Sequence, residues 1–330
     1  MSSNNIKNKS DYKIANVTIS PQQQQQISGS HKNTNNYNGN TDSDTKTRTD
    51  NNNNNNDNNN TSSSRFATIQ SSPSLEDSTN TVSTASINVR GINNPVKFEN
   101  ILEDLINKLV SIIGLQETKL SEPAATAHFK NFAKRYPAAA QYKAYWNFNT
   151  YDWAAGVGLI IANYISKYVQ KVHWHEGRFI AIDLYLPEKK LKIINIYAHQ
   201  ACNYATKGKQ LVKFIKQHIT SAEAESFQCI IMGDFNADPF KYHQTLEHGH
   251  TPPPFFNLIE FLTERNYIDQ SPKDEKGCSF ATFYANNTAT SRVNLIWYPE
   301  DIIRDTFCFD QIWHLPCAQL NTDASSALDH

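Results

Sequence analysis

The chain has 330 residues and a formal net charge of −1, which excludes the strongly basic surface of proteins that coat nucleic acids but leaves room for a local basic patch. No apolar run approaches the roughly 18 residues of a membrane-spanning helix, and the first residues lack the basic and apolar regions of a secretory signal. The five cysteines form no C-x-x-C pair, which argues against structural zinc and a disulfide framework. We therefore expect an intracellular protein of the nucleus or cytoplasm that does not bind membranes.

Residues 1–82 are rich in Asn, Ser and Gln and contain few apolar side chains. Positions 51–60 are almost all Asn, and positions 22–26 are all Gln. Such a segment cannot bury enough apolar area to offset the entropy of ordering its backbone, about 1–2 kcal/mol per residue. We therefore predict a disordered leader over residues 1–82 and one folded domain over residues 83–330.

The folded part begins with a β-α-β pattern. Residues 86–89 form a short strand-like run that Gly91 ends, and Pro95 then opens a segment whose apolar residues recur at helical spacing up to Leu109. A buried strand is predicted over 110–115. The later predicted strands are 142–148, 157–161, 169–175, 179–186, 191–197, 229–232, 280–284, 293–297 and 306–309, and the later predicted helices are 210–219 and 255–265.

Strands in this part of the chain alternate with helices but also form hairpins, such as the one around Glu176-Gly177. This mixture predicts an α/β fold, a four-layer α/β sandwich of two mixed β-sheets with helices outside. His173 and His175 share one face of a predicted strand, which could bind a transition metal but which we interpret as a solvated face.

Acidic and amide side chains stand where predicted strands end. The positions are Asn88, Glu117, Tyr197 with Asn195, Asp234 with Asn236, and Asp329 with His330. The carboxyl ends of strands line the ligand crevice in α/β sheets, and Mg²⁺ prefers a few carboxylate oxygens. Taken singly, each residue suits a solvated loop or a turn equally well. Their order along the chain is the informative feature.

Six short motifs occur in the order found in the endonuclease/exonuclease/phosphatase superfamily, also called DNase I-like. They are Ile87-Asn88-Val89-Arg90-Gly91, Gly114-Leu115-Gln116-Glu117-Thr118-Lys119, Asn195-Ile196-Tyr197-Ala198, Gly233-Asp234-Phe235-Asn236, Ser291-Arg292-Val293-Asn294-Leu295-Ile296-Trp297 and Leu328-Asp329-His330. The second and fifth most resemble apurinic/apyrimidinic endonucleases and the endonuclease domains of LINE-type retrotransposons. The resemblance covers residues 83–330.

The resemblance implies a role for each site residue. Glu117 would be a principal ligand of Mg²⁺, with Mn²⁺ as an alternative, and Asn88 and Asp329 would lie at the metal. Asp234 would orient or deprotonate the attacking water. The remaining implied roles are phosphate contact by Tyr197 and His330, support of Asp234 and of the transition-state oxygens by Asn236, and support of the imidazole ring by Asn294.

The sequence departs from the family pattern at four points. Asn294 and Arg90 each replace an Asp, and Leu328 replaces a Ser. The family continues past the His with a final strand, so we expect a fold truncated at its C-terminus by about one strand.

Three functions remain open at this point. The first is a monomeric, metal-dependent endonuclease acting on DNA, of the apurinic/apyrimidinic or retroelement type. The second is a phosphatase of the same superfamily, and the third is a catalytically impaired or truncated relative derived from a retroelement.

Overall fold

A computed structural model describes residues 11–18, 81–152, 154–187, 189–198, 205–239, 241, 247, 253–270, 282–285, 288–304 and 313–314. The predicted strand at 306–309 and the site residues Asp329 and His330 lie outside these described residues.

One mixed sheet contains six strands in the order β14-β1-β2-β3-β5-β4. Its strands are β1 (Asp11–Thr18), β2 (Thr81–Asn88), β3 (Ile112–Gln116), β4 (Tyr142–Asn147), β5 (Val157–Ala162) and β14 (Trp313–His314). β2 and β3 are parallel, and Asn88 is paired with Gln116. Helix α1 (Pro95–Asn107) provides the crossover that parallel neighbours require.

The second mixed sheet also contains six strands, in the order β10-β13-β9-β8-β7-β6. Its strands are β6 (Val169–His175), β7 (Phe179–Tyr185), β8 (Lys190–Tyr197), β9 (Phe227–Asp234), β10 (Tyr267–Asp269) and β13 (Asn294–Pro299). β8 and β9 are parallel, and helix α4 (Ala205–Ala224) connects them. A separate hairpin consists of β11 (Phe283–Ala285) and β12 (Thr288–Ser291).

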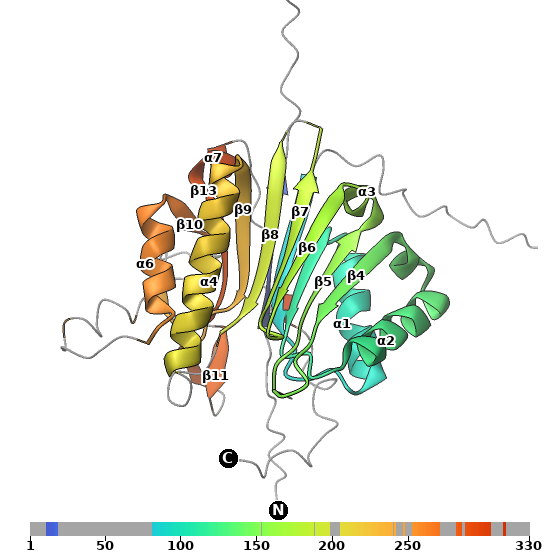
Figure 1. Ribbon diagram of the computed structural model, residues 1–330. Coiled ribbons are helices and arrows are strands. Elements are labelled where there is room, and N and C mark those ends of the chain that lie inside the picture. Colours follow the sequence, from blue (N-terminus) through green and yellow to red (C-terminus); the bar gives the residue numbers. More distant parts are fainter. Residues whose placement is uncertain are drawn as a thin grey trace, which may run out of the picture. The chain divides into compact units, whose positions relative to one another are not determined.

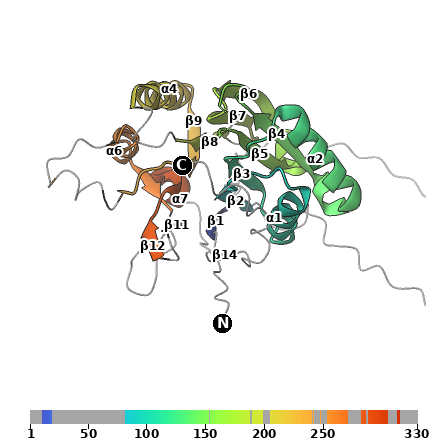
Figure 2. The same cartoon turned by 90° about the horizontal axis from the view of Figure 1, so that it is seen from below.

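The two sheets pack face to face with helices on both outer sides (Figures 1 and 2). Helix α1 and helix α2 (Glu122–Arg135) cover the first sheet, while α4 and α6 (Phe256–Glu264) cover the second. The remaining short helices are α3 (Asn163–Ser166), α7 (Glu300–Arg304) and the 3₁₀ helix η1 (Pro137–Gln141). A third apolar core fills the space between the sheets, with Ile112 and Leu159 on one side and Ile193 and Ile230 on the other. The predicted four-layer α/β sandwich is therefore confirmed.

The predicted helix that opens at Pro95 is confirmed by the structure. α1 begins at the predicted Pro95, and the Asn94 side chain caps it by accepting a hydrogen bond from the backbone N–H of Val96 at 2.9 Å.

Helix α2 was not predicted, although Ser121 caps it and Ala125, Phe129 and Phe132 form its buried stripe. None of the helices in the described part of the chain is long and apolar enough to cross a membrane.

The structure differs from the composition-based prediction within residues 1–82. Strand β1 lies inside the predicted disordered leader and pairs antiparallel with β2, with Lys13 opposite Ser86 and Thr18 opposite Thr81. β2 also begins two residues before the predicted domain start. Tyr12, Ile14 and Val17 are residue types that favour strands, and pairing satisfies the backbone groups along an edge of β2.

We expect two leader deletions to have opposite effects on stability. Removing residues 1–21 removes six β1–β2 residue pairs and should lower the free energy of unfolding by about 3 kcal/mol, since each backbone hydrogen bond contributes on the order of 0.5 kcal/mol net. Removing residues 22–74 shortens the β1–β2 connection from 62 residues (19–80) to nine. A shorter loop closes at lower entropic cost, which should raise the free energy of unfolding by roughly 1–2 kcal/mol.

Urea unfolding of both deletion proteins and the full chain measures these changes. Equal stability of all three proteins would show that β1 contributes nothing to the fold.

Candidate active site

The site is centred on the side-chain amide of Asn88, the last residue of β2. Its nitrogen donates one hydrogen bond to Glu117 Oε1 at 2.6 Å and another to Asp234 Oδ2 at 2.7 Å. Glu117 directly follows β3, and Asp234 ends β9 of the other sheet. Three strand ends from two sheets thus bring together three of the residues that the sequence analysis named.

Backbone geometry fixes Glu117 in this position. Its φ is +52°, a left-handed conformation that a non-glycine residue rarely adopts, and the next residue donates a backbone hydrogen bond to Gly156 O at 3.0 Å. Gly156 itself has φ +117°, and a Cβ there would lie 2.2 Å from Thr118 Oγ1. The loop carrying Glu117 therefore depends on Gly156.

Asp234 is a buried carboxylate with 3% relative exposure. Its Oδ1 accepts a hydrogen bond from the backbone N–H of Asn236 at 2.9 Å, in addition to the Asn88 bond to Oδ2. Burial raises its pKa to about 6, the hydrogen bonds from Asn88 and Asn236 lower that pKa, and the neighbouring Glu117 charge raises it. Asp234 can therefore exchange a proton near neutral pH.

Tyr197 ends β8 and lies beside the same carboxylates. Burial, followed by the charge of Glu117, raises the pKa of its phenol, so the hydroxyl remains a proton donor. The guanidinium of Arg178 lies over the Tyr197 ring at 4.5 Å, and Arg178 Nη2 pairs with Asp152 Oδ2 at 2.6 Å. The sequence analysis gave Arg178 no role, because its contact with Tyr197 depends on packing between the turn before β7 and the end of β8.

Asn236, two residues after β9, and Asn294, the first residue of β13, support the site. The Asn236 side chain donates to Ala198 O at 2.8 Å, while its backbone holds Asp234. Asn294 pairs directly with Asp234 across the two strands. Within the described part of the chain, the Oδ1 atom of Asn294 is buried and has no hydrogen-bond partner. An unpartnered buried acceptor next to Asp234 can accept a hydrogen bond from an N–H group, such as that of an imidazole.

Two cationic side chains belong to the same region. Lys119 Nζ lies 3.5 Å from Glu117 Oε2. Arg90 donates its backbone N–H to Asn88 Oδ1 at 3.0 Å, and its charge contributes to lowering the pKa of Asp234. Arg90 stands where the family pattern has an acid, so this side of the site carries one positive charge in place of one negative charge.

Within the described residues, no three His, Cys, Asp or Glu side chains come together in a group that could hold a metal ion. Asp329, a predicted ligand, and His330, a predicted phosphate contact, lie outside the described residues. Glu117 and Asp234 are the carboxylates that the described structure brings to the site.

The His173 and His175 face was predicted to be solvated, and this was wrong. His173 Nε2 lies 2.8 Å from Asp183 Oδ2, and His175 stacks on Phe214 of α4 with ring centroids 4.1 Å apart. Helix α4 covers this face of the second sheet, which the two-residue alternation could not indicate.

Comparison with known proteins agrees with this geometry. The profile described as "Endonuclease/Exonuclease/phosphatase family" matches residues 85–304. The chain belongs to this family. That assignment confirms the resemblance inferred from the six motifs.

Two solved structures of the endonuclease/exonuclease/phosphatase family illustrate the shared fold. A Neisseria 3′ phosphatase, NExo, solved with a product DNA hairpin, is 15% identical, with a TM-score of 0.50 over 66% of this chain and 86% of that one. The APE2 catalytic domain of Xenopus laevis is also 15% identical, with a TM-score of 0.50 over 66% of this chain and 82% of that one. At this identity the likeness shows the fold alone.

Proposed function

We propose that this protein is a metal-dependent phosphodiesterase that hydrolyses phosphodiester bonds in DNA. The convergence of Glu117 and Asp234 on the amide of Asn88 carries the proposal. Membership of a family of nucleases and phosphatases supports it, as does the product DNA bound by the Neisseria relative. We propose that the protein acts on DNA as a monomer.

The residues of this chain can perform the steps of hydrolysis. Asp234, with a pKa of about 6, is ionised above that pH and can accept a proton from an attacking water. The protonated Tyr197 and the amide of Asn236 can donate hydrogen bonds to phosphate oxygens as their charge grows. Asn294 can hold an imidazole N–H through its Oδ1 atom, which has no partner among the described residues, and we propose His330 as the owner of that ring.

The donor set fits a hard divalent cation. Mg²⁺ keeps several waters and needs only one or two carboxylates, which Glu117 can supply together with the proposed ligand Asp329. When bound, such an ion would neutralise phosphate charge and lower the pKa of a coordinated water. Asn88 would hold Glu117 and Asp234 in place, as it does in this structure.

Replacing Glu117 by Gln should raise the Mg²⁺ concentration that gives half-maximal cleavage by about tenfold or more. The substitution keeps the shape of the side chain but removes its charge, so that ion affinity falls. Cleavage of abasic and plasmid DNA across a Mg²⁺ titration measures the change, with Glu103→Gln, an exposed position on α1, as the control.

Two outcomes would reject parts of this proposal. Equal cleavage by parent and Glu117→Gln at limiting Mg²⁺ would show that Glu117 is not the ligand. A folded parent that cleaves neither DNA nor inositol phosphates with Mg²⁺ or Mn²⁺ would instead support a catalytically impaired relative.

A further inference from the structure

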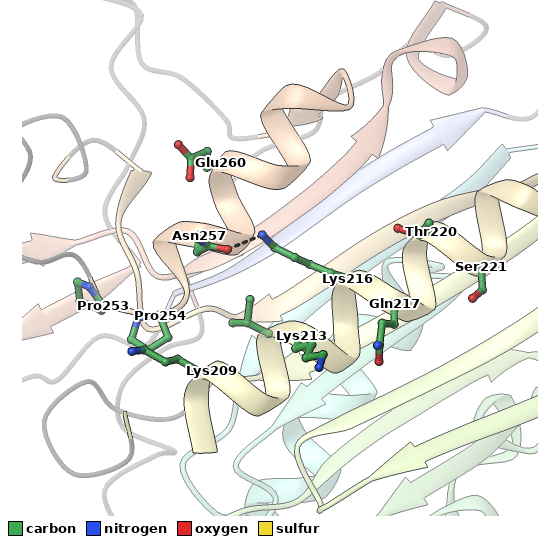
Figure 3. Close-up of a pocket in the computed structure, with 11 residues that line it drawn as sticks. Lys209, Lys213, Lys216, Gln217, Thr220, Ser221, Pro253, Pro254, Asn257 and Glu260 are labelled. Carbon is green, nitrogen blue, oxygen red and sulfur yellow. Dashed lines mark hydrogen bonds between the residues drawn. The ribbon is translucent and has the colours of Figure 1, made fainter. Parts of the chain in front are cut away.

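A groove on the outer side of the second sheet lies away from the residues described above. It runs between α4 and α6, which lie side by side, and has a volume of about 660 Å³ (Figures 1 and 3). Lys209, Lys213 and Lys216 line it from α4, while Pro254 and Asn257 line it from the other side. We refer to it as the α4–α6 groove.

The groove is a local concentration of positive charge on a chain whose net charge is −1. Helix α4 carries Lys207 and the three groove lysines but has no acidic residue before Glu223. Glu260 is the acidic side chain among the residues that line the groove. Lys209 and Lys213 are exposed, and Lys216 is half-buried and donates a hydrogen bond to Asn257 Oδ1. The lining therefore favours an anionic ligand.

The spacing of the lysines matches a polyanion. With a rise of 1.5 Å per residue, Lys209 and Lys216 lie about 10 Å apart along the α4 axis. Each strand of duplex DNA carries one phosphate per roughly 3.4 Å of helix axis, and an extended strand spaces them more widely, so the three lysines can reach two to three phosphates. A small phosphate ester would use one of these positions, whereas a strand would use all three.

An apolar floor lies between the charges. Val212 and the Pro253-Pro254 pair line the groove together with the lysine stems, as the close-up shows for Lys209 beside Pro254 (Figure 3). Such a floor can cover the faces of unpaired bases, which a duplex keeps stacked inside and a single strand exposes. The combination of charge and apolar surface favours a single strand over a duplex.

The groove lies close in sequence to a residue of the candidate active site. Helix α4 begins eight residues after Tyr197, and Gly208 in its first turn faces Pro254 of the groove, with 3.3 Å from an added Cβ to Pro254 Cγ. Lys209 therefore lies at the end of the groove that is nearer in the chain to the site residue.

We propose that the α4–α6 groove binds a single-stranded segment of the nucleic acid that the active site cleaves. This inference rests on the proposed function, since it makes the substrate a polymer that extends beyond the scissile bond. It adds a second contact region that a small phosphate ester would not reach.

The test compares oligonucleotide binding by three full-length proteins in EDTA, where no metal-dependent cleavage occurs. They are the parent, Lys209→Gln/Lys213→Gln/Lys216→Gln, and the control Lys130→Gln/Lys134→Gln/Lys143→Gln, which removes three exposed lysines from the opposite side of the fold. Fluorescence anisotropy with a labelled single strand should show at least about tenfold weaker binding for the groove variant only. Its salt slope should fall by about two, since each single-strand phosphate contact contributes roughly 0.7.

If the triple variant is unstable, the two-lysine variant Lys209→Gln/Lys213→Gln takes its place. It keeps the Lys216 contact with Asn257 and should also bind the single strand more weakly than the parent. Equal losses of single-strand binding in the groove and control variants would overturn the proposal. A groove variant that loses duplex binding as much as single-strand binding would also overturn it. Tighter displacement by a poly-Glu peptide than by unlabelled single strand would also overturn it, because the groove would then be a peptide site.

Cleavage measured separately with Mg²⁺ keeps the two proposals distinguishable. Groove-dependent binding without cleavage of any substrate would retain the groove and reject the proposed function. Cleavage by the parent with unchanged binding by the groove variant would reject the groove and retain the function.

Discussion

Replacement of Asp234 by Asn is expected to reduce DNA cleavage by about 10³-fold while the protein remains folded. The amide cannot accept a proton from water, and general-base catalysis typically contributes 10²- to 10⁴-fold. The new side chain can still accept the backbone hydrogen bond from Asn236. Its NH₂ group would face the Asn88 nitrogen, so one hydrogen bond is lost.

The same substitution should raise stability at high pH. The pKa of Asp234 in the folded protein is raised to about 6 from 3.8. The protonated carboxyl therefore contributes stability that is fully present below pH 3.8 and is lost as the pH rises through about 6. An amide does not ionise, so Asp234→Asn avoids this loss, which is on the order of 3 kcal/mol at most.

Urea unfolding of the metal-free parent and Asp234→Asn at pH 4 and pH 8 measures the change in stability. Single-turnover cleavage rates of the two proteins measure the loss of catalysis. The variant should gain stability relative to the parent between the two pH values. A variant that is much less stable at both pH values would give Asp234 a structural role, and full activity would exclude it as the base.

Replacement of the neighbouring Gly233 by Ala should lower the free energy of unfolding by about 4 kcal/mol or more. Gly233 has φ +142°, a conformation that side chains disfavour, and an added Cβ would lie 2.0 Å from Ile196 O. That oxygen belongs to the backbone of β8, which pairs with β9 at this position, so it cannot move without breaking the sheet. Losses of this size are exceptional among single substitutions.

Gly208→Ala is the matched control for this experiment. Gly208 lies in α4, where Ala favours the helix by about 1 kcal/mol, and its added Cβ would meet Pro254 Cγ at 3.3 Å. We expect a change within about 1 kcal/mol. Similar destabilisation of the two variants in urea would show that the conformation of Gly233 is not special.

The sequence predicted the parts of the fold that local patterns control. The apolar spacing after Pro95 identified α1, and the hairpin around Glu176-Gly177 joins β6 and β7. Helix α2 was missed because it has only three buried side chains, although Ser121 offers a capping signal. β1 was missed because its pairing partner lies more than sixty residues away, and local composition carries no information about such pairing.

The candidate site likewise combines residues that local motifs identified with contacts that arise only in the folded chain. Motif order placed Asn88, Glu117 and Asp234 at strand ends, and the parallel pairs β2–β3 and β8–β9 bring those ends together. The support of Tyr197 by Arg178 could not be predicted, because it depends on packing between a hairpin turn and the end of β8. Nothing in the sequence indicated that Asn294 Oδ1 would be buried beside Asp234 without a partner in the described residues.

The amide of Asn88 has a consequence for the thermodynamics of ion binding. Its two N–H groups hold Glu117 and Asp234 near each other in the folded chain. The entropic cost of gathering these carboxylates is therefore met when the protein folds, and the site is preorganised. Ion affinity would then be governed by the hydration of the ion and by the nearby charges of Arg90 and Lys119, and little of it would depend on the ordering of loops.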